Sequence, residues 1–420
     1  MRTFWPGITL TLAATLIAAP SAAQQAPTTN AQPTLRVFLD CNAHECDFDH
    51  VRREITWVTW VRDRTDADLH LLITDQETGS GGQRYTLTYL GRGRLEGTEK
   101  SLTFVSQGTE TDAEVREGMT RTAAVGLVQF IEQSPLASRL QINYQGAARS
   151  IAVREQRDPW DLWVFRLATE GSLEGEAQQR SYSLEATAEA SRVSEALKFT
   201  LWLNGQRDHE SFELDDGTTI SNTSEDYTAH TVIVWSLGPH WSAGAEGRAN
   251  RSTFLNRDLA LSAGPAVEYN IFPYRESTRR SLTVRYAVEI ASFNYQLPTI
   301  EGKTAQVLPR HVLSISTAVQ QPWGEIFGSV EGTQYLNDPS LHRINTRLRL
   351  EYRLFRGFSL EASAEFSRIK DQFYLPALDL SEEEILLERR QRETDFQYDF
   401  GIGLSYQFGS SFANIVNPRF

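Results

Sequence analysis

Residues 396–408 read Phe-Gln-Tyr-Asp-Phe-Gly-Ile-Gly-Leu-Ser-Tyr-Gln-Phe, and this stretch decides the fold of the chain. Every second residue from Phe396 to Phe408 is apolar, mostly aromatic, and each residue between them is polar or glycine. Successive side chains of a β-strand point to opposite faces, so the stretch predicts a strand with one apolar and one polar face. Such a strand is typical of a wall between lipid and a polar lumen.

The same alternation recurs from residue 160 onward and predicts about twelve strands. An even number of strands is what a single-chain antiparallel barrel requires. We therefore expect an α+β N-terminal periplasmic domain followed by a transmembrane antiparallel β-barrel over residues 160–408. The candidate strands lie near 163–170, 182–189, 197–204, 229–237, 241–250, 259–271, 282–290, 313–319, 325–336, 347–354, 358–366 and 396–408.

The connections between the candidate strands alternate in length, which predicts the orientation of the barrel. Short turns face the periplasm and long loops face outward. The short turns lie near 193–195, 238–239, 273–276, 322–324 and 355–357, and the long linkers near 208–226, 296–308 and 373–392. Aromatic residues such as Trp235, Trp241 and Trp323 cluster beside the short turns, as in an interfacial girdle. Both ends of the barrel segment are therefore expected on the periplasmic side.

Charged residues on the polar faces form a predicted lumen charge network. It consists of Arg285, Glu289, Arg347, Arg349, Arg353, Glu361 and Glu365. Long side chains on neighbouring strands reach one another, so these charges can pair. Twelve strands enclose less space than a porin, so side chains or loops fill much of the lumen. Two interpretations stay open: the pairs lock the barrel shut, or they line a narrow polar path.

Two outer segments are further functional candidates. The 208–226 linker is rich in acids, from Asp208 to Asp226, and residues 381–392 predict a short helix that contains the apolar residues Ile385, Leu386 and Leu387. That helix is either a lid over the mouth of the barrel or part of a solvated loop. Neither segment shows the regular oxygen-ligand spacing of a calcium loop.

The front of the chain predicts export. Arg2, an apolar run from Ile8 to Ala19 and small residues to Ala23 have the pattern of a signal peptide over residues 1–23. Residues 24–33 are assigned as a linker, and no later run of eighteen apolar residues predicts a spanning helix. The mean hydropathy of −0.39 is compatible with a barrel, because alternation hides the lipid-facing residues from an average.

Residues 34–150 predict a periplasmic α/β domain, joined to the barrel by a linker over 151–159. Strands are expected near 35–39, 66–74, 84–89 and 102–105, with a glycine-rich hairpin tip at 78–82. A first helix is expected from Asp47 or Asp49 to Arg62. A second opens with a capping box from Thr111 to Glu114 and ends at Pro135. The glycines at the hairpin tip precede no helix, so no phosphate loop is predicted.

Cys41 and Cys46 are the two cysteines of the chain. In an oxidising periplasm such a pair is expected to form a local disulfide. Histidines and carboxylates nearby, including His44 and His50, leave zinc or copper as the alternative. The spacing is not that of a standard zinc knuckle, so we expect a disulfide and no metal or cofactor.

The formal net charge of −13 bears on possible partners. Nucleic acid binding requires a basic field, so a nucleic acid partner is not expected. Acidic outer loops would attract divalent cations or basic partners instead.

Three sequence segments carry a resemblance to known proteins: the run from Val61 to Asp68, the closing segment Gly403–Phe408, and the tail ending Val416-Asn-Pro-Arg-Phe420. With them, the chain resembles a group of uncharacterised outer-membrane β-barrel proteins that carry an N-terminal periplasmic α/β domain. The resemblance implies an outer-membrane location but no particular reaction. The closing segment also looks like the signal read by the barrel-assembly machinery. Here a tail of residues 409–420 follows it, unlike in barrels that stop at the closing aromatic residue.

Three classes of function follow. The leading hypothesis is a non-enzymatic outer-membrane barrel, either a narrow channel or an envelope assembly or secretion component, whose N-terminal domain docks a periplasmic protein. The second is a structural anchor that holds this domain at the membrane. The third is a barrel-embedded hydrolase. His230 is the histidine that lies squarely within a candidate strand, and no Ser-His-acid arrangement accompanies it, so no enzyme is predicted.

Overall fold

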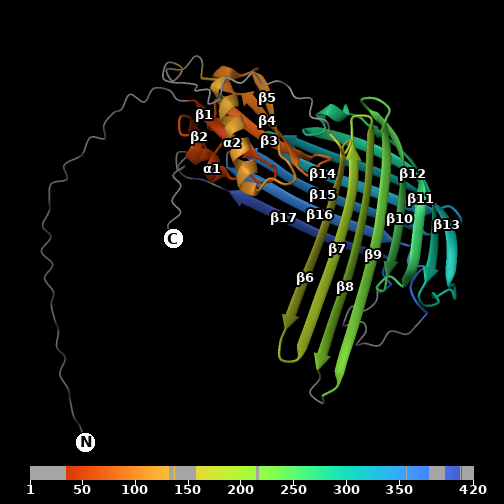
Figure 1. Ribbon diagram of the computed structural model, residues 1–420. Coiled ribbons are helices and arrows are strands. Elements are labelled where there is room, and N and C mark those ends of the chain that lie inside the picture. The colour runs from red at the N-terminus through yellow and green to blue at the C-terminus, as the bar shows by residue number, and fades with distance from the viewer. Residues whose placement is uncertain are drawn as a thin grey trace, which may run out of the picture. The chain divides into compact units, whose positions relative to one another are not determined.

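A computed structural model describes residues 35–131, 137, 158–213, 217–355, 357–377, 393–406 and 408. Residues 34–420 belong to one unit, which contains a small α/β domain and a large antiparallel sheet (Figure 1). The predicted signal peptide, the 24–33 linker, the helix at 381–392 and the tail at 409–420 lie outside the described residues. Most of the 151–159 linker does so as well.

The α/β domain is a five-stranded sheet with strand order β2-β1-β3-β4-β5. β1 pairs in parallel with β2 and β3, and the other neighbours are antiparallel. The elements are β1 (Arg36–Cys41), α1 (Phe48–Glu54), β2 (Thr59–Val61), β3 (Leu69–Glu77), β4 (Gln83–Gly91), β5 (Glu99–Val105) and α2 (Asp112–Val128).

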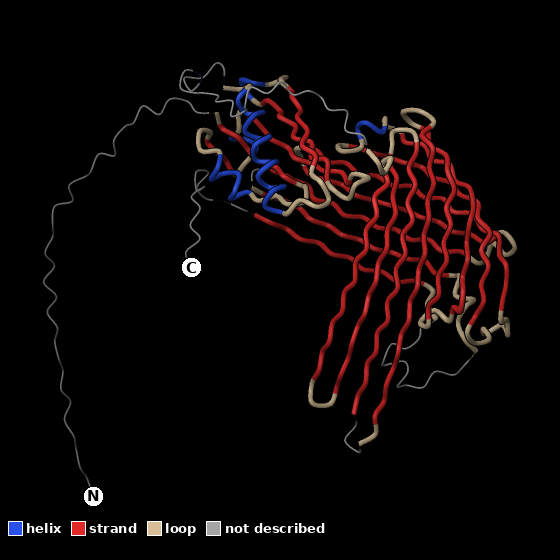
Figure 2. Tube along the Cα trace, viewed as in Figure 1, coloured by secondary structure: helices blue, strands red, loops and turns tan. Residues whose placement is uncertain are grey.

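Both helices pack on one face of this sheet (Figure 2). Val51 of α1 and Met119 of α2 join Leu71 and Leu87 of the strands in a single buried cluster. The predicted capping box is confirmed: Thr111 Oγ1 accepts a hydrogen bond from the Glu114 amide, and the Glu114 carboxylate accepts one from the Thr111 amide. The helix packs closely on β4, since a Cβ at Gly126 would lie 2.1 Å from the Tyr89 ring.

The expected helix from Asp47 to Arg62 is wrong beyond Glu54. Residues 55–61 read Ile-Thr-Trp-Val-Thr-Trp-Val, a run of β-branched and aromatic residues that favours a strand. The end of this run, Thr59–Val61, forms β2, the edge strand beside β1. The second helix also ends earlier than expected, at Val128, so Pro135 does not end it.

The large sheet contains twelve antiparallel strands in chain order, which confirms the predicted number. They are β6 (Trp163–Gly175), β7 (Gln179–Val193), β8 (Leu197–Glu213), β9 (Thr219–Ser236), β10 (Trp241–Ser252), β11 (Arg257–Asn270), β12 (Arg280–Tyr295), β13 (Ala305–Gln321), β14 (Gly324–Tyr335), β15 (His342–Phe355), β16 (Phe358–Ile369) and β17 (Phe396–Tyr406). No ladder joins the edge strands β6 and β17 in the part of the chain described, so the sheet is open there.

The two faces of the large sheet have the polarity expected of a membrane wall. Along β12, Val284, Tyr286, Val288 and Ile290 are exposed, whereas Glu289 between them is buried. The apolar residues of the edge strands are the most exposed, with Leu167 at 83% and Ile402 at 81%. A soluble sheet would bury the apolar face instead. We call the exposed apolar face the outer face and the opposite face the polar face.

The 208–226 linker is not a long loop. β8 continues to Glu213 and β9 begins at Thr219, because the strand alternation continues through Phe212 and Ile220. Most of the acids of this segment therefore lie on an extended hairpin. The connection at 176–178 is also short, so the contrast in loop length rests mainly on residues 370–395.

No helix in the described part of the chain is long and apolar enough to cross a bilayer.

Candidate functional site

The polar face of the large sheet carries ion pairs between neighbouring and next-neighbouring strands. Arg310 of β13 binds Glu289 of β12, with Nη2 and Oε2 2.6 Å apart. Arg285 of β12 reaches over β11 to pair with Glu246 of β10. Glu289 is almost fully buried, so its charge depends on this partner. The sequence placed Arg285 and Glu289 in the lumen network but did not identify Glu246 and Arg310 as their partners.

The predicted cluster on β15 and β16 is looser. Arg347 lies directly opposite Glu365, with Nε and Oε1 3.9 Å apart, and both side chains are about two-thirds exposed. Glu361 lies opposite another acid, Glu351. Neither Arg349 nor Glu361 has an ion-pair partner among the residues that the structure describes. Arg353 leaves this cluster and contacts the α/β domain.

At the end of the sheet away from the short turns, the polar face is covered by residues 371–377, which we call the plug segment. Phe373, Tyr374 and Leu375 are buried against Phe293 and Tyr295 of β12. Sequence reasoning treated these residues as the start of a loop. The signal was available, because Phe373-Tyr-Leu375 is an apolar run that a solvated loop has no need for.

Polar contacts fix the plug segment in place. Asn256 donates from Nδ2 to the Tyr374 carbonyl at 3.0 Å, and the Ile300 amide donates to the Leu375 carbonyl at 2.9 Å. Arg343 of β15 binds Asp371, with Nη2 and Oδ1 2.8 Å apart. The segment is therefore tied to the β10–β11 connection, the β12–β13 connection and strand β15, and it covers this end of the polar face.

The opposite end of the sheet contacts the α/β domain through its short turns. Ser191 donates to the Gly79 carbonyl at 2.9 Å, and Gln76 donates to Ser277 at 2.7 Å. Arg279 pairs with Glu99 at 2.7 Å. The glycine-rich hairpin tip at 78–82 is therefore a docking element within the chain.

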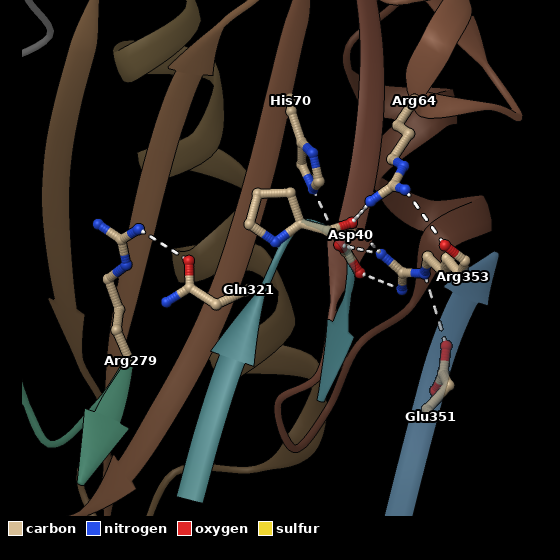
Figure 3. Close-up of polar contacts among 8 residues, drawn as sticks. Asp40, Arg64, His70, Arg279, Gln321, Glu351 and Arg353 are labelled. Atoms are coloured by element: carbon tan, nitrogen blue, oxygen red, sulfur yellow. Dashed lines mark hydrogen bonds and ion pairs between the residues drawn. The ribbon is translucent and has the colours of Figure 1, made fainter. Parts of the chain in front are cut away.

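The centre of this interface is a buried group of Asp40, His70 and Arg353 (Figure 3). His70 Nε2 lies 2.8 Å from Asp40 Oδ2, and Arg353 Nη2 lies 2.7 Å from Asp40 Oδ1. Asp40 and His70 belong to the face of the α/β sheet not covered by the helices, and both are almost fully buried. Phe38 packs edge-on against His70 and lies under the Arg353 guanidinium.

The protonation of this group follows from its contacts. Burial alone would raise the pKa of Asp40, but the hydrogen bonds from His70 and Arg353 outweigh burial, so the pKa lies below its usual range. Burial lowers the pKa of His70 more than the Asp40 carboxylate raises it. His70 is therefore neutral, and because an ionised carboxylate is only an acceptor, its Nε2 carries the hydrogen.

Arg64 and Asp63 extend the interface. Arg64 donates to the backbone carbonyls of Pro322 and Arg353, and Asp63 accepts from the Gly357 amide at 2.8 Å. Both residues come from the Val61–Asp68 motif noted in the sequence. That motif thus contacts two short turns of the large sheet. Sequence reasoning assigned it no role.

The remaining sequence candidates are placed as follows. Cys41 and Cys46 form a disulfide, which confirms that prediction. Among the described residues, no three His, Cys, Asp or Glu side chains gather as metal ligands. His230 lies on the polar face opposite Arg248 and Trp202. No serine or carboxylate in the described ranges is hydrogen-bonded to it.

Comparisons with known proteins give no family. No protein-family model matches the chain, and no curated protein matches it significantly. Similar solved structures include the NanC porin (9% identity, 58% of this chain and 99% of that one, TM-score 0.27). The translocator domain of the autotransporter NalP from Neisseria meningitidis shares 12% identity; the match covers 69% of this chain and 98% of that one, with a TM-score of 0.27. The transport unit of the autotransporter AIDA-I from Escherichia coli shares 11% identity; the match covers 67% of this chain and 97% of that one, with a TM-score of 0.25. At these TM-scores the likeness carries no argument about function.

Proposed function

We propose that this chain is an outer-membrane barrel protein with a narrow polar passage and a periplasmic α/β docking domain. The observation that carries the proposal is the inverted burial along strands such as β12, where Val288 and Ile290 are exposed and Glu289 is buried. Surfaces of this kind are stable against hydrocarbon. In a bilayer the free edges of β6 and β17 would leave backbone groups unpaired, so we also propose that these two strands pair to close the barrel.

The passage follows the polar face between two closures. The α/β domain contacts the short-turn end, and the plug segment covers the other end. Between them, a cavity of about 410 Å³ is lined by polar groups that include Glu268, Arg285 and Arg347. The proposed channel is therefore closed in this state, and opening requires the plug segment to move.

A structural anchor is the second candidate, and the plug segment favours it. Aromatic residues buried at one end of the lumen suit a barrel that never conducts. In that case the role of the sheet is to hold the α/β domain at the membrane.

Conductance in planar bilayers separates the two candidates. Replacing Phe373 and Tyr374 by serine removes the apolar contacts of the plug segment, so the channel proposal predicts frequent ionic currents where the unmodified protein shows few. Phe355→Ser, at an exposed position on the short-turn rim, is the matched control and should leave the current unchanged. If the Phe373→Ser/Tyr374→Ser protein inserts but conducts no more than the unmodified protein, the anchor is the correct function.

The expected partners follow from this location. Outer-membrane lipids would surround the outer face, and the barrel-assembly machinery would read the closing segment near Tyr406. A periplasmic protein would bind the α/β domain, whose helix α2 leaves Val125 exposed. Pull-down from envelope extracts with the full chain, compared with a chain lacking residues 34–131, tests this last partner. Equal capture by both chains would argue against a docking role.

A further inference from the structure

A cavity of about 360 Å³ lies between the α/β domain and the turn that joins β15 to β16. It is formed by β1, α1 and the 62–65 segment on one side, and by β15, β16 and β17 on the other. Its volume lies within the range of roughly 300–1,000 Å³ that is usual for ligand pockets. The proposed passage does not use this cavity.

The walls of the cavity are basic, although the chain as a whole is strongly acidic. Among the described residues, four guanidinium groups line it, against two carboxylates. The lining charges are Arg52, Arg62, Arg64, Arg353, Asp40 and Asp63.

The two carboxylates already have partners. Asp40 binds His70 and Arg353, as described above. Asp63 accepts hydrogen bonds from the Thr65 amide at 2.8 Å and from the Gly357 amide at 2.8 Å. Both charges act favourably on Arg64, but they do not outweigh its burial and the repulsion from Arg353, so its pKa stays lowered.

Within the described ranges, the other three arginines form no ion pair with a carboxylate. Arg64 donates only to backbone carbonyls. The Nε atoms of Arg52 and Arg62 are buried and have no hydrogen-bond partner in the part of the chain that the structure describes. Burial lowers the pKa of Arg52, and burial together with the charge of Arg353 lowers the pKa of Arg64. An anion in the cavity would relieve the cost of burying the charges of Arg52 and Arg64, and it would offer an acceptor to the Arg62 guanidinium.

We propose that this cavity binds a phosphate-bearing anion through Arg52, Arg62 and Arg64. Guanidinium groups match the geometry of phosphate oxygens and bind them with paired hydrogen bonds. The exposed rings of Phe355 and Tyr406 lie at the same end of the sheet as the cavity, which would suit a lipid headgroup. Free phosphate offers the same chemistry, and the two sources are separated below.

The first test is calorimetric titration of inorganic phosphate into the full chain, purified in a neutral, phosphate-free detergent. The unmodified protein should bind phosphate. Arg52→Gln/Arg62→Gln should bind it at least tenfold more weakly, because each lost charge-assisted hydrogen bond is worth about a factor of ten or more. The matched control is Arg53→Gln/Arg84→Gln, which removes two exposed arginines of the same domain outside the cavity and should bind as the unmodified protein does.

A second titration distinguishes the source. The probe is dihexanoyl phosphatidylglycerol, and dihexanoylglycerol, which lacks the phosphate, is its control. A lipid headgroup is the ligand if the phospholipid binds more tightly than phosphate, is displaced by phosphate, and the control does not bind. Equal affinity for the two phosphate probes identifies free phosphate.

Arg52→Lys/Arg62→Lys should keep part of the affinity, which guards against misfolding of the glutamine variant. The proposal is overturned if neither phosphate probe binds the unmodified protein, or if the glutamine variant binds phosphate unchanged. Phosphate binding is measured independently of the bilayer currents, so the proposed anion site and the proposed channel can be rejected separately.

Discussion

Asp40, His70 and Arg353 show how single residues join the two parts of this chain. Asp40 and His70 lie on the paired strands β1 and β3, where His70 is directly opposite Phe38. Arg353 lies near the end of β15, before the short connection at 356–357. A buried carboxylate needs both of its partners to stay ionised at low cost. The group therefore specifies how the α/β domain sits on the short turns.

Removing one partner of this group should destabilise the interface more than removing two. Arg353→Met leaves the Asp40 carboxylate buried beside a neutral histidine, so we expect a loss of about 3–5 kcal/mol in the free energy of opening. Asp40→Asn/Arg353→Met should lose less, because the charge of Asp40 is removed together with that of its partner. Hydrogen exchange of the β1 and β3 amides measures the free energy of opening of both variants. A double variant that is less protected than Arg353→Met would contradict the role given to this pair.

The same group predicts a loss of stability in mild acid. Because burial lowers the pKa of His70, the unfolded chain binds a proton near pH 6.5 that the folded chain binds only at lower pH. The free energy of unfolding of the domain should therefore fall as pH drops from 7 to 5, by at most about 1.4 kcal/mol per pH unit. The lowered pKa of Asp40 acts in the same direction, but only near and below about pH 4.

His70→Gln keeps a hydrogen-bond donor to Asp40 but does not titrate. It should therefore remove most of the decrease in the free energy of unfolding between pH 7 and 5. His44→Gln is the matched control. The hydrogen bond to Asp75 raises the pKa of His44, so its contribution has the opposite sign: it is present below about pH 6.5 and is lost as pH rises. The free energy of unfolding of His44→Gln should therefore fall between pH 7 and 5 at least as steeply as that of the unmodified protein. An unchanged slope in His70→Gln would contradict the assignment.

At the scale of elements, the strands of the large sheet could be predicted because their signal is a strict period of two. All twelve candidate strands overlap observed ones, and the alternation at 396–408 matches β17. The errors arose where two local signals competed. The acids at Asp47 and Asp49 predict a helix start, but the β-branched run after Glu54 stops the helix, and its end at Thr59–Val61 forms β2 beside β1.

The candidate site was harder to predict than the strands, because its contacts join residues far apart in the sequence. Arg353 and Asp40 are separated by most of the chain, and nothing local marks them as partners. The polar character of Arg285 and Glu289 could be inferred from strand parity, but their true partners Glu246 and Arg310 depend on the observed register. The plug segment was not predicted, because residues 373–392 were assigned to one long outer linker and only residues 381–392 were considered as a lid.

Adjacent residues of β16 test the two faces of the sheet directly. Ala362 belongs to the outer face and Ser363 to the polar face. Ala362→Arg should destabilise the protein in a bilayer by about 2–4 kcal/mol if it lies near the midplane. Ser363→Arg should be tolerated, since Glu361 and Glu365 flank it on the same face. Urea titration in vesicles measures both variants, and equal losses would show that the faces were misassigned.

At the scale of the whole molecule, the edges of the large sheet are its most informative feature. Leu167 of β6 and Ile402 of β17 are strongly exposed, and a bilayer gives their backbones no water to bind. Cysteine pairs that place Phe165 or Leu167 against Phe400, Ile402 or Leu404 should therefore cross-link within one chain after insertion. Cross-linked dimers in place of monomers would mean that a second copy, and not β6, covers β17.

The central claim is that hydrocarbon contacts the outer face of the large sheet, and spin labels along β12 in vesicles test it most directly. Single cysteines from 284 to 290 can carry the label, because Cys41 and Cys46 are paired. Collisions with dissolved oxygen should peak at Val284, Tyr286, Val288 and Ile290, and collisions with a water-soluble nickel reagent at the positions between them. Oxygen and nickel accessibilities that rise and fall together along β12, with no period of two, would contradict the claim.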